Sequence, residues 1–317
     1  MTRGQRSQFI AIVKENLPLC REHFRLTLLL PQFPATEPGQ FVQLLCRDPG
    51  DQSAEVEVDW NEDRPLEGHR DPFEPQAMLR RPFSLAGRRD LRGGVELDVI
   101  HRVVGVGTEW LSQLKLGDNV SVLGPLGNQF ELPPPREMGI LVAGGVGIPP
   151  MLYLAEKLKG RAIAFCGATT RDLLPFTLGE MGDEPFWDPA LRVAEFARLH
   201  IPSVVTTDDS TFGYGGYVTQ ALEQYLESVT DPPPFTIYTC GPELMMKRVA
   251  DIAISRRIPC QVAVERAMAC GMGTCQSCCI RVREGSGVRV QGSANEGWRY
   301  KLACTDGPIF AAADLLW

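Results

Sequence analysis

With 317 residues and a hydrophobic fraction of 44%, the chain has the composition of a globular protein and the length of about two or three domains. Its net charge of −7 lies mostly in residues 48–79, and the near-neutral remainder offers no basic groove, so we expect no nucleic-acid binding. The first residues lack the apolar core of a signal peptide, and no apolar run approaches the roughly 18 residues of a membrane span, so we expect a soluble, cytoplasmic protein without membrane contacts.

Residues 1–135 are predicted to form an antiparallel β-barrel. Short β segments separated by proline, glycine and charged turns, with little helix between them, are typical of such barrels. One short helix is expected at residues 108–117, with Thr108 as its cap. The expected strands cover residues 8–16, 24–33, 39–46, 95–104 and 118–127.

Two stretches of this barrel carry groups suited to an anionic ligand. The sequence RRPFSL places the guanidinium of Arg81 close to the hydroxyl of Ser84, and arginine gives a fixed fork for phosphate oxygens. Further along, HRVVGVGT supplies His101 for stacking, and Gly107 with Thr108 at a helix start, where backbone amides bind phosphate. Taken by itself, Arg81 is also explained as an ordinary surface arginine near a turn.

Residues 136–258 follow a rhythm of strand, glycine-rich turn and helix, which predicts a doubly wound parallel sheet. GGVG at 144–147 follows an apolar strand and precedes a helix with prolines in its first turn, and CGP at 240–242 repeats that geometry. GGVG alone is equally well explained as a plain strand-to-helix turn. Because ligands collect at the carboxyl ends of parallel strands, the two turns together predict a dinucleotide site. Its residues would be Gly144, Gly145, Gly147, Cys240, Gly241 and Pro242.

Residues 259–317 are dense in glycine and cysteine and poor in aliphatic residues, so they need an inorganic group to hold their shape. A C-x4-C-x2-C spacing followed by a fourth cysteine after 25 residues matches plant-type 2Fe-2S ligation. Zinc is the alternative, but zinc sites typically use paired short spacings. Cys279 is excluded, because extended backbone turns its side chain away from that of Cys278. The predicted ligands are Cys270, Cys275, Cys278 and Cys304.

The chain has ten cysteines in all, and without an export signal disulfides are not expected. Four of them lie in apolar or strand-like surroundings, where a free cysteine packs as a small hydrophobic residue. We assign no function to Cys20, Cys46, Cys166 and Cys260.

The order of these pieces resembles the ferredoxin-reductase superfamily, and within it the electron-transfer subunits of the NAD-linked, two-subunit (type B) dihydroorotate dehydrogenases. The likeness rests on RPFS, HRVVGVGTEWLSQLKLGDNVSVLGPLGNQFEL, GGVGIPPMLYLAEKL, CGPELMMKRVA and ERAMACGMGTCQSC. It implies an FAD-binding barrel, an NAD-binding α/β domain and a C-terminal 2Fe-2S domain. It also implies FAD contacts from Arg81, Pro82, Phe83, Ser84, Ile100, His101, Arg102, Gly107 and Thr108.

The same resemblance implies a partner: an FMN-containing catalytic subunit that oxidises dihydroorotate to orotate in pyrimidine synthesis. Electrons would pass from that subunit through the cluster and FAD to NAD. No acid–base catalytic residue is expected in this chain, because the cofactors carry the redox chemistry.

Several alternatives stay open. A reductase subunit of a hydrogenase or of a bifurcating transhydrogenase would share the flavin, nucleotide and cluster pieces, and a non-catalytic redox sensor would share the flavin and cluster. For the nucleotide, Arg171 could pair with the 2′-phosphate of NADP and Asp172 with a ribose hydroxyl of NAD. Residues 48–79, with ten acidic residues against two arginines, and residues 179–200 are interpreted as insertions relative to the family.

Overall fold

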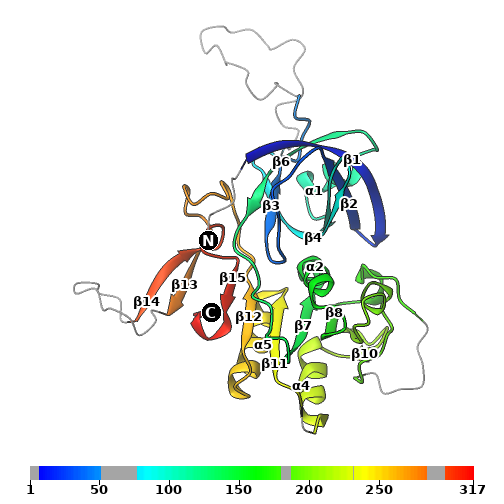
Figure 1. Cartoon of the computed structure of the whole chain (residues 1–317), viewed down its shortest axis with the longest axis vertical. Coiled ribbons are helices and arrows are strands. Elements are labelled where there is room, and N and C mark those ends of the chain that lie inside the picture. The colour runs from blue at the N-terminus through cyan, green and yellow to red at the C-terminus, as the bar shows by residue number, and fades with distance from the viewer. Residues whose placement is uncertain (1–6, 51–76, 180–186, 231, 284–296) are drawn as a thin grey trace.

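The computed structural model of the chain describes residues 7–50, 77–179, 187–230, 232–283 and 297–317. It shows a β-barrel, a helix-flanked sheet below it and a small hairpin beside the sheet, which confirms the predicted fold class (Figure 1). Most of the acidic stretch 48–79 and residues 180–186 of the second predicted insertion lie outside the described residues. Within the described ranges, no helix is long and apolar enough to cross a membrane.

Six antiparallel strands close the barrel in the order β1-β2-β5-β4-β3-β6. Alternation forms its core: Ala11 and Val13 of β1 are buried, whereas Ile10 and Ile12, which alternate with them, are exposed. The sequence prediction lacked strand β4 except for its entry at RPFS, and it placed the helix start at Thr108, two residues too late. The elements are β1 (Ser7–Cys20), β2 (His23–Leu30), β3 (Phe41–Leu44), β4 (Arg81–Leu91), β5 (Gly94–Arg102), β6 (Asn119–Leu126) and α1 (Val106–Gln113).

The second part is a seven-stranded sheet in the order β10-β9-β8-β7-β11-β12-β15, parallel except for β15. The chain runs from β7 outward through β8 and β9, then returns to the other side of β7 with β11, so β7 and β11 flank the topological switch point. Its strands are β7 (Met138–Gly144), β8 (Ala162–Ala168), β9 (Ser203–Thr207), β10 (Tyr214–Gly215), β11 (Phe235–Cys240), β12 (Cys260–Ala263) and β15 (Ile309–Ala311).

Helices cover both faces of this sheet. Along β7, Ile140 and Val142 belong to one core cluster, together with α4 and α5, whereas Leu141 and Ala143 belong to the other, together with α2. The continuous apolar run of a parallel strand therefore serves two cores. The described part of the second predicted insertion contains α3. The helices are α2 (Ile148–Leu158), α3 (Ala194–Ala197), α4 (Val218–Ser228) and α5 (Glu243–Ser255).

The sheet continues past residue 258, where the nucleotide domain was predicted to end. β12 pairs with β11, and β15 returns from the C-terminal segment to pair with β12. Between them stands the hairpin of β13 (Cys279–Arg283) and β14 (Trp298–Leu302). Its buried residues share the core that α4 and α5 cover, so the cluster segment is packed onto the sheet.

Two polar side chains fasten the three parts together. Tyr153 of α2 donates a hydrogen bond to the carbonyl oxygen of Thr36 in the barrel, 2.8 Å away. Asn128, just after β6, accepts from the N–H of Ile309 at 2.8 Å and donates to the carbonyl oxygens of Asp306 and Ile309 at 3.0 and 2.8 Å. The barrel is thus bonded to both the nucleotide sheet and the C-terminal segment.

Candidate functional site

The RPFS motif forms the start of β4, next to β3. Pro82 pairs with Gln43 and Ser84 with Phe41, and Arg81 is exposed whereas the three residues after it are half-buried. The guanidinium of Arg81 donates to the carbonyl oxygen of Leu79 at 3.0 Å, and the motif presents this exposed group beside a partly accessible strand face. An exposed guanidinium beside a hydroxyl is suited to an anionic cofactor.

Cys46 lies between Arg81 and the first turn of α1. Burial raises the pKa of its thiol to about 12, and the nearby charge of Arg81 works against that rise. A Cβ on Gly107 would lie 3.2 Å from the Cβ of Cys46, so the glycine lets α1 approach the barrel closely. The first turn of a helix leaves backbone N–H groups without intrahelical partners, and Arg81 lies in the same region. Together they suit a phosphate group.

Thr108 was predicted to be the N-terminal cap of α1, but it lies inside the helix, three residues after the capping position at Gly105. The helix begins after Gly105, and the Thr108 hydroxyl reaches back to accept from the N–H of Gly105 at 3.2 Å and of Val104 at 2.9 Å. The turn before α1 is therefore fixed in shape by this side chain.

His101 is buried between two aromatic rings, with Phe24 stacked at 5.8 Å and Phe83 edge-on at 6.1 Å between ring centroids. Burial lowers its pKa to about 4, an effect that the nearby Thr108 backbone partly offsets, so the imidazole is neutral at pH 7. Within the described chain, neither ring nitrogen forms a hydrogen bond of normal geometry. Ile100, the residue before it, is also buried. Both side chains are therefore largely inaccessible from the surface.

A cavity of about 610 Å³ opens at the carboxyl ends of the parallel strands. Gly144, Gly145 and Pro242 line it, and so do His23 and Arg102 from the barrel. Arg102, predicted to contact FAD, also pairs with Glu22 at 2.8 Å. The cavity therefore lies between the two parts, where a nucleotide can face a flavin in the barrel.

The two predicted turns pack against each other beneath this cavity. A Cβ on Gly147 would lie only 2.1 Å from the carbonyl oxygen of Cys240, and one on Gly241 would lie 2.9 Å from that of Gly144. Gly241 also has a φ of 150°. Cys240 is buried at the end of β11, and burial raises its pKa to about 12, so its thiol is uncharged at pH 7.

Sequence reasoning missed Asp208, which follows β9 and lines the cavity. Burial, and then the charge of Asp209, raises the pKa of its carboxyl. By contrast, Arg171 lies over the ring of Phe212 at 5.0 Å, and Asp172 pairs with Arg21 of the barrel at 3.0 Å. Neither of these two residues lines the cavity. Asp208 brings into the cavity a carboxylate able to accept from a ribose hydroxyl, and the signal for it was its position directly after a buried strand.

The four predicted cluster cysteines lie close together. The thiol of Cys270 accepts from the N–H groups of Met272 and Cys275, each at 3.4 Å. The pKa of Cys304 is raised to about 12, first by burial and then by a hydrogen bond with Cys278. The charge of Cys270 contributes to the same rise. The loop that wraps the cysteines uses positive φ at Gly271 (67°) and Gly273 (90°).

The exposed thiol of Cys275 has a lowered pKa. The hydroxyl of Ser277, at 3.2 Å, and then backbone N–H groups lower its pKa to about 6, which favours the thiolate that binds metals. Cys278 is buried and Cys279 after it is exposed, as the alternation at the start of β13 requires. In the part of the chain described, no three His, Cys, Asp or Glu side chains converge tightly enough for a single ion. A two-iron cluster instead spreads its four thiolates over two centres, and the N–H donors and loop shape fit it.

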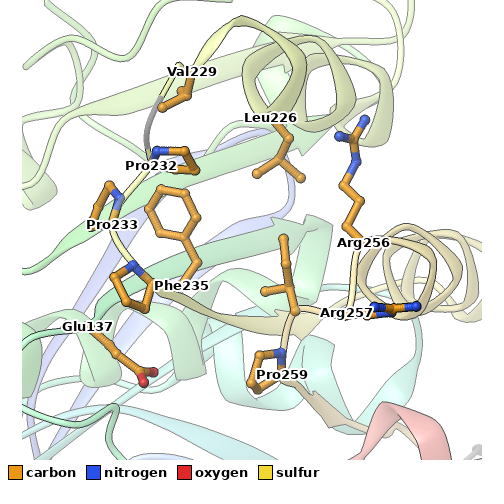
Figure 2. A pocket seen from close by; sticks show the side chains of 11 residues that line it. Glu137, Leu226, Val229, Pro232, Pro233, Phe235, Arg256, Arg257 and Pro259 are labelled. Carbon is orange, nitrogen blue, oxygen red and sulfur yellow. The ribbon is translucent and has the colours of Figure 1, made fainter.

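A second hollow, of about 580 Å³, lies at the opposite edge of the sheet (Figure 2). Prolines and Phe235 form one side of it, and Arg256 and Arg257 the other. Both arginines follow the C-terminus of α5, where cations are favoured, and Arg256 pairs with Glu227 at 3.2 Å. None of the predicted cofactor residues lines this hollow, so we assign it no part in electron transfer.

In the comparison with known proteins, two family models match the chain, one over the cluster segment and one over the barrel. The iron-sulfur cluster binding domain of dihydroorotate dehydrogenase B covers residues 265–316, and the siderophore-interacting FAD-binding domain covers residues 21–129. The electron transfer subunit of dihydroorotate dehydrogenase B (NAD(+)) from Caldanaerobacter subterraneus is 31% identical over 264 residues, 83% of this chain and 92% of that protein. The chain belongs to this family of electron-transfer subunits. The Bacillus caldolyticus subunit is 34% identical over 75% of this chain and 80% of its own length.

Solved structures agree with this electron-transfer subunit fold. The structure of an NADH-dependent reduced ferredoxin-NADP oxidoreductase, studied for flavin-based electron bifurcation, has a TM-score of 0.67 and 25% identity, and covers 97% of this chain and 90% of that one. A cytochrome P450 reductase from Amycolatopsis has a TM-score of 0.54 at 24% identity over 80% of this chain and 66% of that one, which shows a shared fold alone.

Proposed function

We propose that this electron-transfer subunit carries electrons from an FMN-containing catalytic subunit, which oxidises dihydroorotate, through a 2Fe-2S cluster and FAD to NAD. The observation that carries the proposal is that the three candidate sites adjoin one another. The cluster loop lies against β3, β3 pairs with the flavin strand β4, and His23 and Arg102 of the barrel line the nucleotide cavity. The proposed cluster ligands are Cys270, Cys275, Cys278 and Cys304.

Each part of the chain has a separate task in this proposal. Arg81, Ser84 and the first turn of α1 bind the FAD phosphates and fix the cofactor in the barrel. The turns at 144–147 and 240–242 hold the nucleotide at the switch point. FAD, when bound, supplies the exchange between single electrons and a hydride. The domains proposed for these tasks are residues 1–135, 136–258 and 259–317.

A cytoplasmic location is part of the same proposal. No cysteine forms a disulfide in the part of the chain that the structure describes, and all ten lie in that part. Reduced cysteines in such number are typical of reducing compartments.

Arg81→Ala should weaken FAD binding about 10- to 100-fold, because a charge-assisted hydrogen bond contributes about 1.5–3 kcal/mol. Flavin content after gel filtration and the dissociation constant of added FAD measure the effect. Arg25→Ala, which removes another exposed barrel arginine paired with Glu15, is the control. Equal flavin retention in both variants would count against the barrel assignment.

Asp208→Ser should raise the ratio of NADPH to NADH reduction rates about tenfold, which corresponds to about 1.4 kcal/mol. The carboxylate accepts from the 2′-hydroxyl of NAD and repels a 2′-phosphate, whereas a serine hydroxyl has no charge to repel the phosphate and can donate a hydrogen bond to it. Stopped-flow reduction of the flavin by each nucleotide measures the ratio. An unchanged preference would show that another residue selects the nucleotide, and Asp172→Ser serves as the comparison because its carboxylate pairs with Arg21.

A second candidate function draws support from the likeness to the NADH-dependent reduced ferredoxin-NADP oxidoreductase. A reductase subunit of an electron-bifurcating complex would use the same three sites with another partner. Co-purification decides between them: with the tagged chain expressed in its own cells, we expect a dihydroorotate-oxidising subunit to be retained. Retention of a second pyridine-nucleotide-dependent subunit in its place would favour bifurcation.

A further inference from the structure

Gln43 stands between the barrel and the cluster loop. It lies on β3 and its side chain is fully buried. Its amide nitrogen donates to the carbonyl oxygen of Ala269 at 3.3 Å, one residue before Cys270. The barrel therefore bonds directly to the loop that carries the proposed cluster ligands.

The amide group of Gln43 also lies flat against the residue after Cys270. A Cβ added to Gly271 would be 2.7 Å from the amide carbon of Gln43, 2.8 Å from its nitrogen and 2.9 Å from its oxygen. Gly271 has a φ of 67°, so the loop bends there into a conformation that places its backbone on the amide. The contact therefore requires a residue without a Cβ at position 271, where the Gln43 amide occupies that space.

The other end of Gln43 belongs to the flavin strand pair. Its backbone pairs with Pro82 of the RPFS motif, and Arg80, just before that motif, donates to the carbonyl oxygen of Ser121 at 2.9 Å on the neighbouring strand. The loop at Cys270 is therefore connected to the flavin motif through the Gln43 side chain and the pairing of Gln43 with Pro82.

Packing alone does not explain a glutamine at this position. Among the described residues, its amide oxygen has no hydrogen-bond partner, although it is buried. An unsatisfied buried acceptor costs about 1–3 kcal/mol, and an apolar side chain of similar size would avoid that loss. A polar dipole beside the ligand loop does have a use, because hydrogen bonds, charge and solvent exposure set the potential of an iron–sulfur cluster.

We infer that Gln43 is a positioning residue that holds the Cys270 loop on the flavin barrel and sets the reduction potential of the cluster. The inference rests on the proposed function, since it assumes a 2Fe-2S cluster on the four cysteines. It assigns to the barrel a role in the cluster's redox properties beyond binding FAD.

Midpoint potentials of cluster and flavin, measured by anaerobic spectroscopic titration of the FAD- and cluster-loaded protein, test this inference. Gln43→Glu puts a carboxyl beside Cys270, and in titrations at a pH where this buried carboxyl is ionised we expect its charge to disfavour cluster reduction at least tenfold, about 59 mV for one electron. Gln43→Leu removes the dipole without adding charge, and its shift should be smaller but at least threefold. The flavin potential should stay unchanged in both.

Gln40→Leu is the matched control, because Gln40 bonds to Gly127 and Glu37 instead of the cluster loop. We expect it to keep the wild-type cluster potential. Wild-type potentials in both Gln43 variants, or a raised potential in Gln43→Glu, would overturn the inference. Loss of the cluster from both Gln43 variants but not from the control would also overturn it, since Gln43 would then serve assembly and not potential. If the wild-type protein itself does not contain two irons and two sulfides per chain, the proposed function is wrong, and this inference is wrong with it.

Discussion

Cys275→Ser will abolish the visible absorption of the cluster and reduce bound iron to background, while FAD stays bound. The pKa of the Cys275 thiol is lowered to about 6, and the thiolate is the form that ligates iron. A serine oxygen is a poor substitute for that ligand. Iron and sulfide content, absorption and electron paramagnetic resonance of the reduced protein measure the loss.

Cys279→Ser is the matched control for this result. Cys279 is exposed at the start of β13, one residue from buried Cys278, and the alternation of the strand turns the two side chains apart. The variant should keep the full cluster spectrum. The opposite pattern, with the cluster kept in Cys275→Ser and lost in Cys279→Ser, would refute the proposed ligand set.

Gly147→Ala is expected to lower the rate of flavin reduction by NADH about 100-fold, since a displacement of about 1 Å near the reacting groups has that effect. The added methyl would lie 2.1 Å from the carbonyl oxygen of Cys240, and backbone on both sides must move to admit it. The two turns proposed to hold the nucleotide would separate. Anaerobic stopped-flow spectroscopy measures the rate, and flavin and iron content confirm that the other sites are intact.

Gly145→Ala tests whether the effect is due to this close contact or to any change in the turn. In the described structure nothing lies within 4 Å of a Cβ at Gly145, although its φ of 52° makes an alanine strained by about 1–2 kcal/mol. We expect a rate within about tenfold of wild type, because that strain affects the turn locally. Equal losses in both variants would contradict the role given to the contact between the turns.

The sequence predicted the parts of the fold that local patterns determine. Neighbouring residues in the sequence are enough to predict the alternation in β1, the apolar run of β7 and the turns after β7 and β11. The cysteine spacing is a local pattern of the same kind.

Features that depend on distant residues were not predicted. The return of β15 to pair with β12, the contact of Gln43 with Gly271 and the place of Asp208 in the cavity each join segments far apart in the chain. Arg171 and Asp172 show the converse: their sequence position suits a ribose site, but Phe212 and Arg21 engage them instead. Tertiary contacts decide such cases, and one sequence does not display them.

The most direct test of electron transfer through this chain is turnover of the assembled complex. Dihydroorotate is added without oxygen to the purified complex with its catalytic subunit and NAD, and orotate and NADH are measured together. We predict one NADH formed for each orotate, and loss of NADH but not of the first orotate equivalent when the chain carries Cys275→Ser. Equal NADH formation with the cluster absent would contradict the proposed path.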